Sequence, residues 1–273
     1  MISHTLNINN KNGVMFITFP KFEKTGLVNL LFSTRIGGVS DGIWSSMNLS
    51  FNRGDKRDNV LENYKRLCDC KDIDINNLVL SKQTHTNNVK TVTKADCGTG
   101  MFKESFSDID GLVTNQKGVA LVTQYADCTP LVFLDTKNKV IATSHAGWRG
   151  TVKEIGKKTV EKMVNEFGSN PSDIIVGIGP CIKECCYEVD DPVYNEFLKI
   201  KYLDLNKIFI SKPNGRYMLD LVEANRQILI NAGILPTNID ASDICTCCNH
   251  DELHSHRATG GKRGNLAAII QLA

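Results

Sequence analysis

The apolar residues of this 273-residue chain gather in short runs that are separated by turn residues. Several runs are rich in Val and Ile, and all are too short for a helix, so the pattern predicts β-strands. The seven predicted strands span Gly13–Thr18, Val28–Ser33, Asn77–Leu80, Val119–Gln124, Leu131–Leu134, Val140–Ser144 and Asp173–Ile178.

Helical periodicity is present in three further segments, which are Lys56–Cys68, Thr151–Phe167 and Leu219–Ala232. Each places its apolar residues on one face. The third is followed by Gly233 and then Pro236, a common helix stop. Strands mixed with helices at this spacing predict an α/β or α+β fold, although the pattern does not give the order of the strands in a sheet.

Composition narrows the class of protein. Hydrophobic residues make up 41% of the chain, enough to bury a sizeable core, which excludes disorder for most of it. The 32 Lys and Arg residues nearly balance 30 Asp and Glu residues, so no basic patch for nucleic acid or an anionic membrane is expected. No repeat or linker divides the chain, and residues 1–273 are expected to form one domain. An enzyme or a small-molecule binder is the default class.

The expected cellular location of the protein rests on two signals that the sequence does not show, a membrane helix and an export signal. No apolar run approaches the roughly 20 residues of a membrane helix. The first residues show no basic stretch followed by an apolar one, so no export signal is visible. The ten cysteines are therefore interpreted as reduced thiols of a cytoplasmic protein. No protein partner can be inferred.

The densest concentration of chemical groups lies in Tyr125–Pro130 and Ser144–Gly150. Cys128 ends one apolar run and His145 ends a later one, so adjacent strands could bring a thiol and an imidazole to one rim of a sheet. A helix is predicted to begin right after Gly150, where its free N–H groups could meet an anion. His85, at the end of another short strand, supplies a second imidazole.

Two chemistries suit one cysteine and two histidines. An imidazole can lower the thiol pKa and hold a thiolate ready for nucleophilic attack. Alternatively, His, His and Cys can supply three ligands to zinc and leave a fourth position open for water. A third interpretation is a buried, inert cysteine with two ordinary histidines. The long spacing from 85 to 128 to 145 matches no zinc-finger pattern, so the residues alone leave these alternatives open.

A series of motifs adds a family resemblance. They are Ser33–Ser40 (STRIGGVS), Gln83–His85, Asp108–Gly111 (DIDG), Ala126–Pro130 (ADCTP), His145–Gly150 (HAGWRG), Gly177–Ile182 (GIGPCI), Cys186–Val189 (CYEV) and Leu219–Leu221. In this order they resemble the laccase-domain family, also called YfiH/YlmD-like or multicopper polyphenol oxidase. The resemblance covers roughly residues 25 to 270.

The resemblance implies a fold, a metal site and an activity. The fold would be a layered α/β (α+β) sandwich related to the catalytic domain of cytotoxic necrotizing factor toxins. The ligands would be His85, Cys128 and His145, holding zinc, with copper possible. Family members are described as purine nucleoside phosphorylases that also deaminate adenosine and cleave methylthioadenosine. A second description concerns the editing of misincorporated serine in peptidoglycan precursors.

The family name itself can be tested against the residues. A true laccase needs a blue-copper centre and a multicopper cluster, both built largely from imidazoles. This chain has six histidines, and its only His-x-His is His254–Ser255–His256. We therefore expect any polyphenol oxidation to come from adventitious copper at the His/Cys/His site.

Phosphorolysis suggests further residues. Phosphate needs cations, for which Arg35 in a Gly-rich loop and Arg149 are candidates, although either arginine could instead brace a loop. Gln83 and Asp110 could contact the ribose or the base, while Asp110 could equally cap a turn. Cys181 is a candidate second pocket thiol or, alternatively, a small hydrophobic residue at a turn.

The remaining thiols receive no site. Cys185 and Cys186 have no obvious partners, and a zinc-ribbon interpretation of Cys245–Cys248 is discounted because no second ligand pair lies at finger-like spacing. Segment 253–265 departs from the usual family pattern. If it lines the substrate pocket, specificity could differ, with His254 or His256 replacing a lost tyrosine.

The sequence thus predicts a zinc-dependent purine nucleoside phosphorylase, acting on adenosine, inosine and methylthioadenosine with phosphate, that also deaminates adenosine. One rival is a cysteine hydrolase that edits peptidoglycan precursors, with Cys128 as nucleophile, His145 as base and a muropeptide or another amide as substrate. The other is a metal-binding protein whose polyphenol oxidase activity is incidental.

Overall fold

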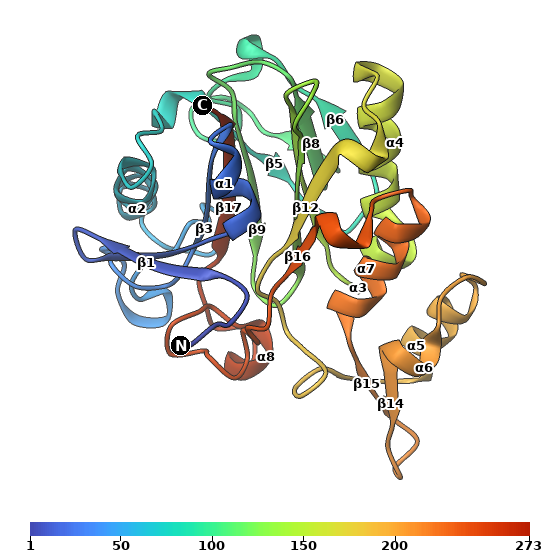
Figure 1. Ribbon diagram of the computed structural model, residues 1–273. Helices are drawn as coiled ribbons and strands as arrows, with labels where there is room; N and C mark the ends of the chain where they lie inside the picture. Colours follow the sequence, from blue (N-terminus) through green and yellow to red (C-terminus); the bar gives the residue numbers. More distant parts are fainter.

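Two six-stranded sheets pack face to face in the computed structural model, which describes residues 1–273 (Figure 1). The first sheet has the order β1 (Asn7–Lys11), β2 (Val14–Thr18), β3 (Val28–Ser33), β17 (Leu266–Leu272), β9 (Ala120–Tyr125), β4 (Leu78–Val79). The second has the order β16 (Ile239–Ala241), β12 (Ile174–Ile178), β10 (Thr129–Asp135), β11 (Val140–Ala146), β8 (Gly111–Thr114), β6 (Val89–Thr91).

Helices cover both outer faces of this pair of sheets. Helix α2 (Arg57–Asp69) packs on the first sheet, and α4 (Ile155–Phe167) with α7 (Leu221–Asn231) packs on the second, which gives the layered arrangement in Figure 1. The shorter helices are α1 (Pro20–Thr25), α3 (Trp148–Val152), α5 (Asp191–Leu198), α6 (Leu205–Ile208) and α8 (His256–Thr259). None of the helices combines the length and apolar character that crossing a membrane requires.

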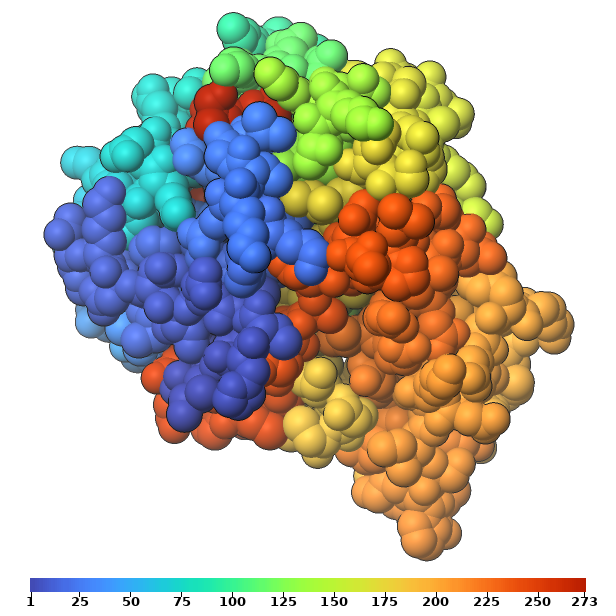
Figure 2. Space-filling model, viewed as in Figure 1, coloured from blue at the N-terminus to red at the C-terminus, as the bar shows by residue number.

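Two small sheets complete the structure. Strands β13 (Glu188–Val189), β15 (Tyr217–Leu219) and β14 (Phe209–Ser211) join α5 and α6 around a separate apolar cluster. This part bulges from the rest of the surface at the lower right of Figure 2. Strands β5 (Ser81–Lys82) and β7 (Phe106–Ser107) form a short parallel pair, and β5 ends shortly before His85 in the chain.

The strand sequences are almost continuously apolar because both faces of each sheet are covered. In β10, Leu131 and Phe133 pack toward α4 and α7, while Val132 and Leu134 join the core between the sheets. Strands buried on both faces lose the alternation of polar and apolar residues that a half-exposed strand shows. All seven predicted strands are present, with small differences at their ends.

Two predictions of local structure need correction. The predicted helix Thr151–Phe167 is two helices, α3 and α4, because Glu154 takes a left-handed conformation with φ of 56° that an α-helix cannot include. The helix near Gly150 also begins earlier, at Trp148, with Gly147 as its N-cap. Arg149 therefore lies in the first turn of α3 and not ahead of it.

One central strand has no counterpart among the predicted elements. Strand β17 pairs with both β3 and β9 in the middle of the first sheet. Its sequence, LAAIIQL, is a short apolar run with two alanines, and periodicity alone does not separate such a run from a buried helical segment. The strand therefore depends on partners that lie more than a hundred residues away along the chain.

Candidate functional site

The two residues Cys128 and His145 meet because of the register between β10 and β11. Pro130 pairs with His145, so Cys128, just before β10, lies beside Gly147, just after β11. A Cβ atom added at Gly147 would stand 2.8 Å from Cys128 Sγ and 3.0 Å from His85 Cδ2. Glycine is needed at this position because the sulfur and the imidazole fill the space where a side chain would begin.

The His85–Cys128–His145 trio has the dimensions of a ligand set. One ligand atom from each residue lies within 4.8 Å of the others. Cys128 Sγ is 3.8 Å from His85 Nε2, and the two imidazole rings lie edge to face with their centroids 4.8 Å apart. The three residues, far apart in the sequence, therefore come together as the motifs suggested.

Asp110 lies behind the trio and fixes two of its members. Its Oδ1 accepts hydrogen bonds from His145 Nδ1 at 2.8 Å and from the His85 N–H at 3.1 Å. Its Oδ2 accepts bonds from the Thr84 N–H and from both the N–H and the hydroxyl of Thr86. Burial raises the pKa of Asp110, but the bonds from His145 and Thr86 outweigh it and bring the pKa to about 2.

The ionised Asp110 determines which nitrogen of His145 is available. Because the carboxylate can only accept, Nδ1 carries the proton and Nε2 is left to face the other trio members. His85 is held differently: its backbone has a left-handed φ of 65°, and Lys153 Nζ donates to its carbonyl oxygen at 3.2 Å. A non-glycine residue in this conformation is strained, which is common where a side chain must be aimed at a site.

The thiol and imidazole of the trio are also electrically coupled. Burial raises the pKa of Cys128, but His145 and then His85 outweigh this effect and bring the pKa to about 6. Burial lowers the pKa of His145, but Cys128 and Asp110 outweigh it and bring the pKa to about 9. Without a metal, the pair is therefore a thiolate and an imidazolium at neutral pH.

The donor set fits a single metal ion. Two imidazole nitrogens and one thiolate suit zinc or copper, and the bond from His145 to Asp110 is the carboxylate–histidine arrangement that commonly supports a zinc ligand. Three protein ligands leave a position for a water or substrate atom. Only two of the six histidines lie in the trio, so the imidazoles of a multicopper cluster are not assembled here.

Two adjoining cavities, of about 390 and 310 Å³, meet at the trio. The larger has apolar and aromatic walls from Trp148, Ile182, Tyr187 and Leu221. The smaller is polar and includes Ser50, Asn52 and Gln83. His85 and Cys128 line both cavities, together with Arg53, Ala126 and Arg263. Pockets of this size accommodate small organic ligands.

Arginine side chains are concentrated around the larger cavity, where Arg53, Arg149, Arg257 and Arg263 all contribute to the lining. Arg263 is only 8% exposed, and burial together with nearby Arg53 lowers its pKa to about 10. Its Nε has no hydrogen-bond partner. A buried arginine with an unused donor, next to an exposed second arginine, is suited to an anion, because a negative group would offset both the desolvation of Arg263 and its repulsion from Arg53.

The predicted substrate residues fall into two groups. Arg149 lines the larger cavity, with its guanidinium 4.2 Å from the Trp148 ring, and Gln83 lines the smaller one. The Gln83 side chain also exchanges two hydrogen bonds with the backbone of Gln124 in β9. Both residues therefore lie where a ligand could reach them.

The other three candidates line neither cavity. Arg35 donates to the carbonyl oxygens of Ser45 and His250, which is the loop-bracing role that the sequence left open as an alternative. Cys181 is fully buried, which raises its pKa to about 12. Asp110 is fully buried behind His145, so it reaches the cavities only through the trio.

Sequence reasoning gave no role in the pocket to Arg53, Tyr187, Arg257 and Arg263. Arg257 and Arg263 belong to the divergent segment 253–265, which does line the larger cavity. His256 from the same segment also lines it, whereas His254 is buried and its pKa is lowered to about 3. The CYEV motif that contains Tyr187 was the available signal for that residue.

Comparisons with known proteins identify the family. The family described as multi-copper polyphenol oxidoreductase laccase matches residues 29–273. The Bacillus subtilis protein named purine nucleoside phosphorylase YlmD is 37% identical over 243 residues, covering 88% of this chain and 86% of that protein. A protein from an unknown prokaryote, named adenosine deaminase RL5, is 35% identical over 238 residues, covering 85% and 90%.

A solved structure confirms the predicted fold. The crystal structure of the Bacillus licheniformis hypothetical protein YfiH superimposes with a TM-score of 0.92 at 32% identity, covering 97% of this chain and 99% of that one. The layered α/β arrangement of the YfiH/YlmD type is therefore shown for nearly the whole chain.

Proposed function

Because this chain belongs to the multi-copper polyphenol oxidoreductase laccase family, we propose that it is a zinc-dependent purine nucleoside phosphorylase that also deaminates adenosine. The names of two similar proteins, a purine nucleoside phosphorylase and an adenosine deaminase, support this proposal. The proposed substrates are adenosine, inosine and methylthioadenosine, with phosphate. One observation carries the proposal: the trio opens onto a cavity that has aromatic walls and four arginines. We also propose that it works in the cytoplasm, where reducing conditions keep Cys128 as a thiol.

The two cavities suggest how a nucleoside would lie. Trp148 and Tyr187 offer flat aromatic surfaces, and Ile182 and Leu221 offer apolar contacts, both of which suit a purine ring. Arg53 and Arg263 lie where both cavities meet, so an anion bound by them would be close to the trio and to the sugar of a bound nucleoside. Arg149, in the first turn of α3, could add a further contact to phosphate.

Phosphorolysis exchanges one bond at the anomeric carbon for another. The C1′–N9 bond breaks, a phosphate oxygen forms the new bond to C1′, and the departing purine takes up a proton. The transition state resembles the oxocarbenium ion of glycoside hydrolysis, in which positive charge develops on the sugar. Arginines hold the phosphate dianion in place, and the positioning of two reactants in one cavity removes much of the entropic barrier.

His85, Cys128 and His145 would hold the metal, and Asp110 would orient His145. Zinc held by these residues would supply a hydroxide nucleophile at neutral pH for deamination of the purine ring. The chain's own contribution is the tautomer of His145 and the thiolate of Cys128.

The test is product analysis after the metal content of the purified protein has been measured. Wild-type protein with adenosine and phosphate is expected to yield adenine with ribose 1-phosphate, together with inosine from deamination. Omission of phosphate should abolish adenine release and leave deamination intact. Cys128→Ala is expected to lose both activities and the metal at the trio.

A matched control is Cys97→Ala, which removes a half-buried thiol whose only hydrogen bond goes to the Gly118 carbonyl oxygen. This variant should keep both activities. The proposal is wrong if zinc-loaded wild-type protein leaves all three nucleosides unchanged with phosphate present. Metal binding without turnover would favour a metal-binding protein with incidental oxidase activity.

A second candidate function is a cysteine hydrolase, with a peptidoglycan precursor or another amide as substrate. One observation favours it: Cys128, His145 and Asp110 form a connected thiolate, imidazole and carboxylate, with the pKa of Cys128 at about 6. Cys128 would be the nucleophile, His145 the base and Asp110 the carboxylate that orients the base. Full activity after chelation, with an acyl group trapped on Cys128, would establish this function and exclude the zinc-dependent one.

A further inference from the structure

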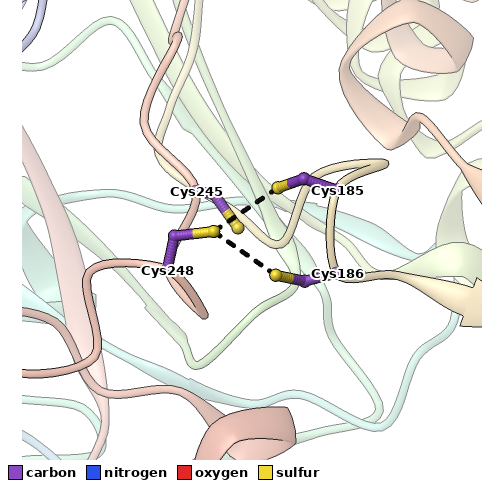
Figure 3. Close-up of side chains that lie close together, drawn as sticks. All are labelled: Cys185, Cys186, Cys245 and Cys248. Carbon is purple, nitrogen blue, oxygen red and sulfur yellow. Dashed lines mark hydrogen bonds between the residues drawn. The ribbon is translucent and has the colours of Figure 1, made fainter.

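Four cysteine side chains outside the trio converge at a second place in the molecule. Cys185 and Cys186 lie on the loop between β12 and β13, and Cys245 and Cys248 lie on the loop that follows β16. Figure 3 shows all four sulfur atoms pointing toward a common centre. Cys248 Sγ is 3.5 Å from Cys185 Sγ and 3.4 Å from Cys186 Sγ, and all four sulfurs lie within 4.8 Å of one another.

No site for these four cysteines is predicted from the sequence. Local spacing indicates no partners for Cys185 and Cys186, and it argues against metal binding by Cys245–Cys248 because no second ligand pair lies nearby in the sequence. The structure corrects both interpretations, because the missing pair is Cys185–Cys186, about sixty residues earlier in the chain. The tertiary fold brings the two loops together, whereas a zinc-finger pattern includes only ligands that are close in the sequence.

We propose that Cys185, Cys186, Cys245 and Cys248 form a structural zinc site with four thiolate ligands. The geometry is close to the one that zinc needs: a tetrahedral ion with Zn–S bonds of about 2.3 Å keeps its sulfurs about 3.8 Å apart. Zinc would displace the four thiol protons into solvent without any redox change. Four soft ligands in a tetrahedral arrangement select zinc over hard cations.

The loops are already held as a metal site requires. The Thr246 N–H donates to the Cys181 carbonyl oxygen at 2.9 Å, which ties the two loops together. The Cys186 N–H donates to the Lys183 carbonyl oxygen, and the Asn249 N–H and side-chain amide both donate to the Cys245 carbonyl oxygen. These turns fix the direction of the thiols. Two of the four, Cys185 and Cys248, are exposed, so zinc has an entry path from solvent.

The same loops build one wall of the larger cavity. Ile182 and Tyr187 flank the Cys185–Cys186 pair, and Arg257 follows Cys248 in the chain. The Arg257 guanidinium donates to the carbonyl oxygens of Cys186 and Glu188 and lies 5.3 Å from the centre of the Tyr187 ring. Zinc at the cluster would therefore clamp together the two segments that present Tyr187 and Arg257 to the cavity.

The experiment is elemental analysis and cobalt substitution of the full-length protein, purified anaerobically with a reductant. Wild-type protein is expected to bind two zinc ions per chain. The double variant Cys185→Ser/Cys248→Ser should keep one, and His85→Ala/Cys128→Ala should keep the other. With cobalt, the intense thiolate-to-metal charge-transfer bands of a four-sulfur site should persist in the second double variant and disappear in the first.

Cys247→Ser is the matched control, because Cys247 lies between two proposed ligands but is not one of the four. It should keep both metals. Since a double variant could fail to fold, wild-type protein alone supplies a second test: zinc should protect Cys185, Cys186, Cys245 and Cys248 from alkylation, and a chelator should expose them, while Cys247 reacts in both states.

Three results would overturn the proposal. They are a single metal per wild-type chain bound at the trio, iron in place of zinc at the cluster, and a disulfide between any two of the four cysteines in the reduced, zinc-loaded protein. The proposal is independent of the proposed function. Loss of nucleoside phosphorolysis with two zinc ions present would contradict the function only.

Discussion

The trio and the four-thiol cluster are two candidate metal sites that are built in different ways. Both bring ligand atoms from distant parts of the chain to within 4.8 Å of one another. The trio lies at strand ends between the sheets, has three ligands and faces a cavity. The four-thiol cluster lies on two surface loops, has four sulfur ligands and leaves no ligand position free. An open set suits catalysis and a closed set suits structure.

The two sites also differ in the contacts that hold their ligand residues in place. Around the trio, Asp110 receives five hydrogen bonds and Gly147 leaves space for the sulfur, so the ligands are held before any metal arrives. In the four-thiol cluster, backbone turns hold the loops and two thiols remain exposed. The comparison indicates that the buried side chain of Asp110 holds the trio, whereas backbone turns hold the loops of the cluster, and zinc there would add a link between the two loops.

The largest expected effect comes from Asp110→Asn, which removes the carboxylate beneath the trio. An amide cannot accept all five bonds, and the tautomer of His145 is no longer fixed. Metal affinity at the trio is expected to fall about 10- to 100-fold, and unfolding free energy by about 1–3 kcal/mol. Competition with a zinc chelator and urea denaturation measure the two effects.

The neighbouring Asp108→Asn is its control, because the Asp108 side chain accepts only the Thr84 hydroxyl and is exposed. This variant should leave zinc affinity at the trio unchanged. The four-thiol cluster should keep its metal in both variants. Equal loss of metal in the two variants would contradict the role given to Asp110.

The next effect is expected from Gly147→Ala. The added methyl would lie 2.8 Å from Cys128 Sγ, so the sulfur or the strand end must move. Overpacking of this kind costs about 1–3 kcal/mol, and here it falls on the ligand itself. Zinc titration should show weaker binding at the trio alone. Gly156→Ala, whose methyl meets only leucine side chains, serves as the control and should bind zinc normally.

A smaller effect is expected from Cys185→Ser/Cys248→Ser on catalysis. Without the clamp, Tyr187 and Arg257 are less firmly held at the cavity wall. The KM for the nucleoside should rise about tenfold, equivalent to about 1.4 kcal/mol of binding, while kcat changes little. Hydrogen exchange should increase in residues 181–188 and 245–257. An unchanged KM with faster exchange would restrict the clamp to a role in stability.

The smallest effect concerns pH and the metal-free trio. Alkylation of Cys128 should rise with a midpoint near pH 6, because its pKa is lowered to about 6 and it becomes a thiolate above that value. At pH 7 the thiolate fraction is about 90 times that of a thiol with a pKa of 9, but nucleophilicity falls about 30-fold, which leaves a rate about threefold higher. Peptide mapping after iodoacetamide treatment measures it.

The same experiment separates Cys128 from the other thiols. Burial raises the pKa of Cys247, so this residue should react only at higher pH. His145→Gln should move the Cys128 midpoint upward, since His145 is the main group that stabilises the thiolate. A midpoint for Cys128 near pH 9 in metal-free wild-type protein would contradict the coupling between the two residues.

Part of the fold followed from local patterns. The predicted strands in β2, β3, β9, β10, β11 and β12 are present because each is a bounded run of apolar residues. Strand β17 could not be assigned in this way, although it lies at the centre of the first sheet. The break at Glu154 was also invisible, because a single left-handed residue leaves no trace in helical periodicity.

The functional residues divide along similar lines. The sequence singles out His85, Cys128, His145 and Arg149 because they lie in dense motifs at the ends of apolar runs, and the structure gathers them around two adjoining cavities. Arg35 and Cys181 also lie in motifs, yet their motifs serve loop bracing and core packing. A motif indicates that its residues have a structural or functional role, and only the contacts in the structure show which of them face a ligand cavity.

The sequence by itself determined the α/β class, the family and the three residues of the trio, because these are recorded in short stretches of neighbouring residues. The tertiary structure alone decided that Asp110 lies behind the trio, that Arg53 and Arg263 share one cavity, and that two cysteine pairs meet. The physical reason is that each of these contacts joins segments far apart in the chain. Their proximity is set by strand register and sheet packing, which no local window of the sequence contains.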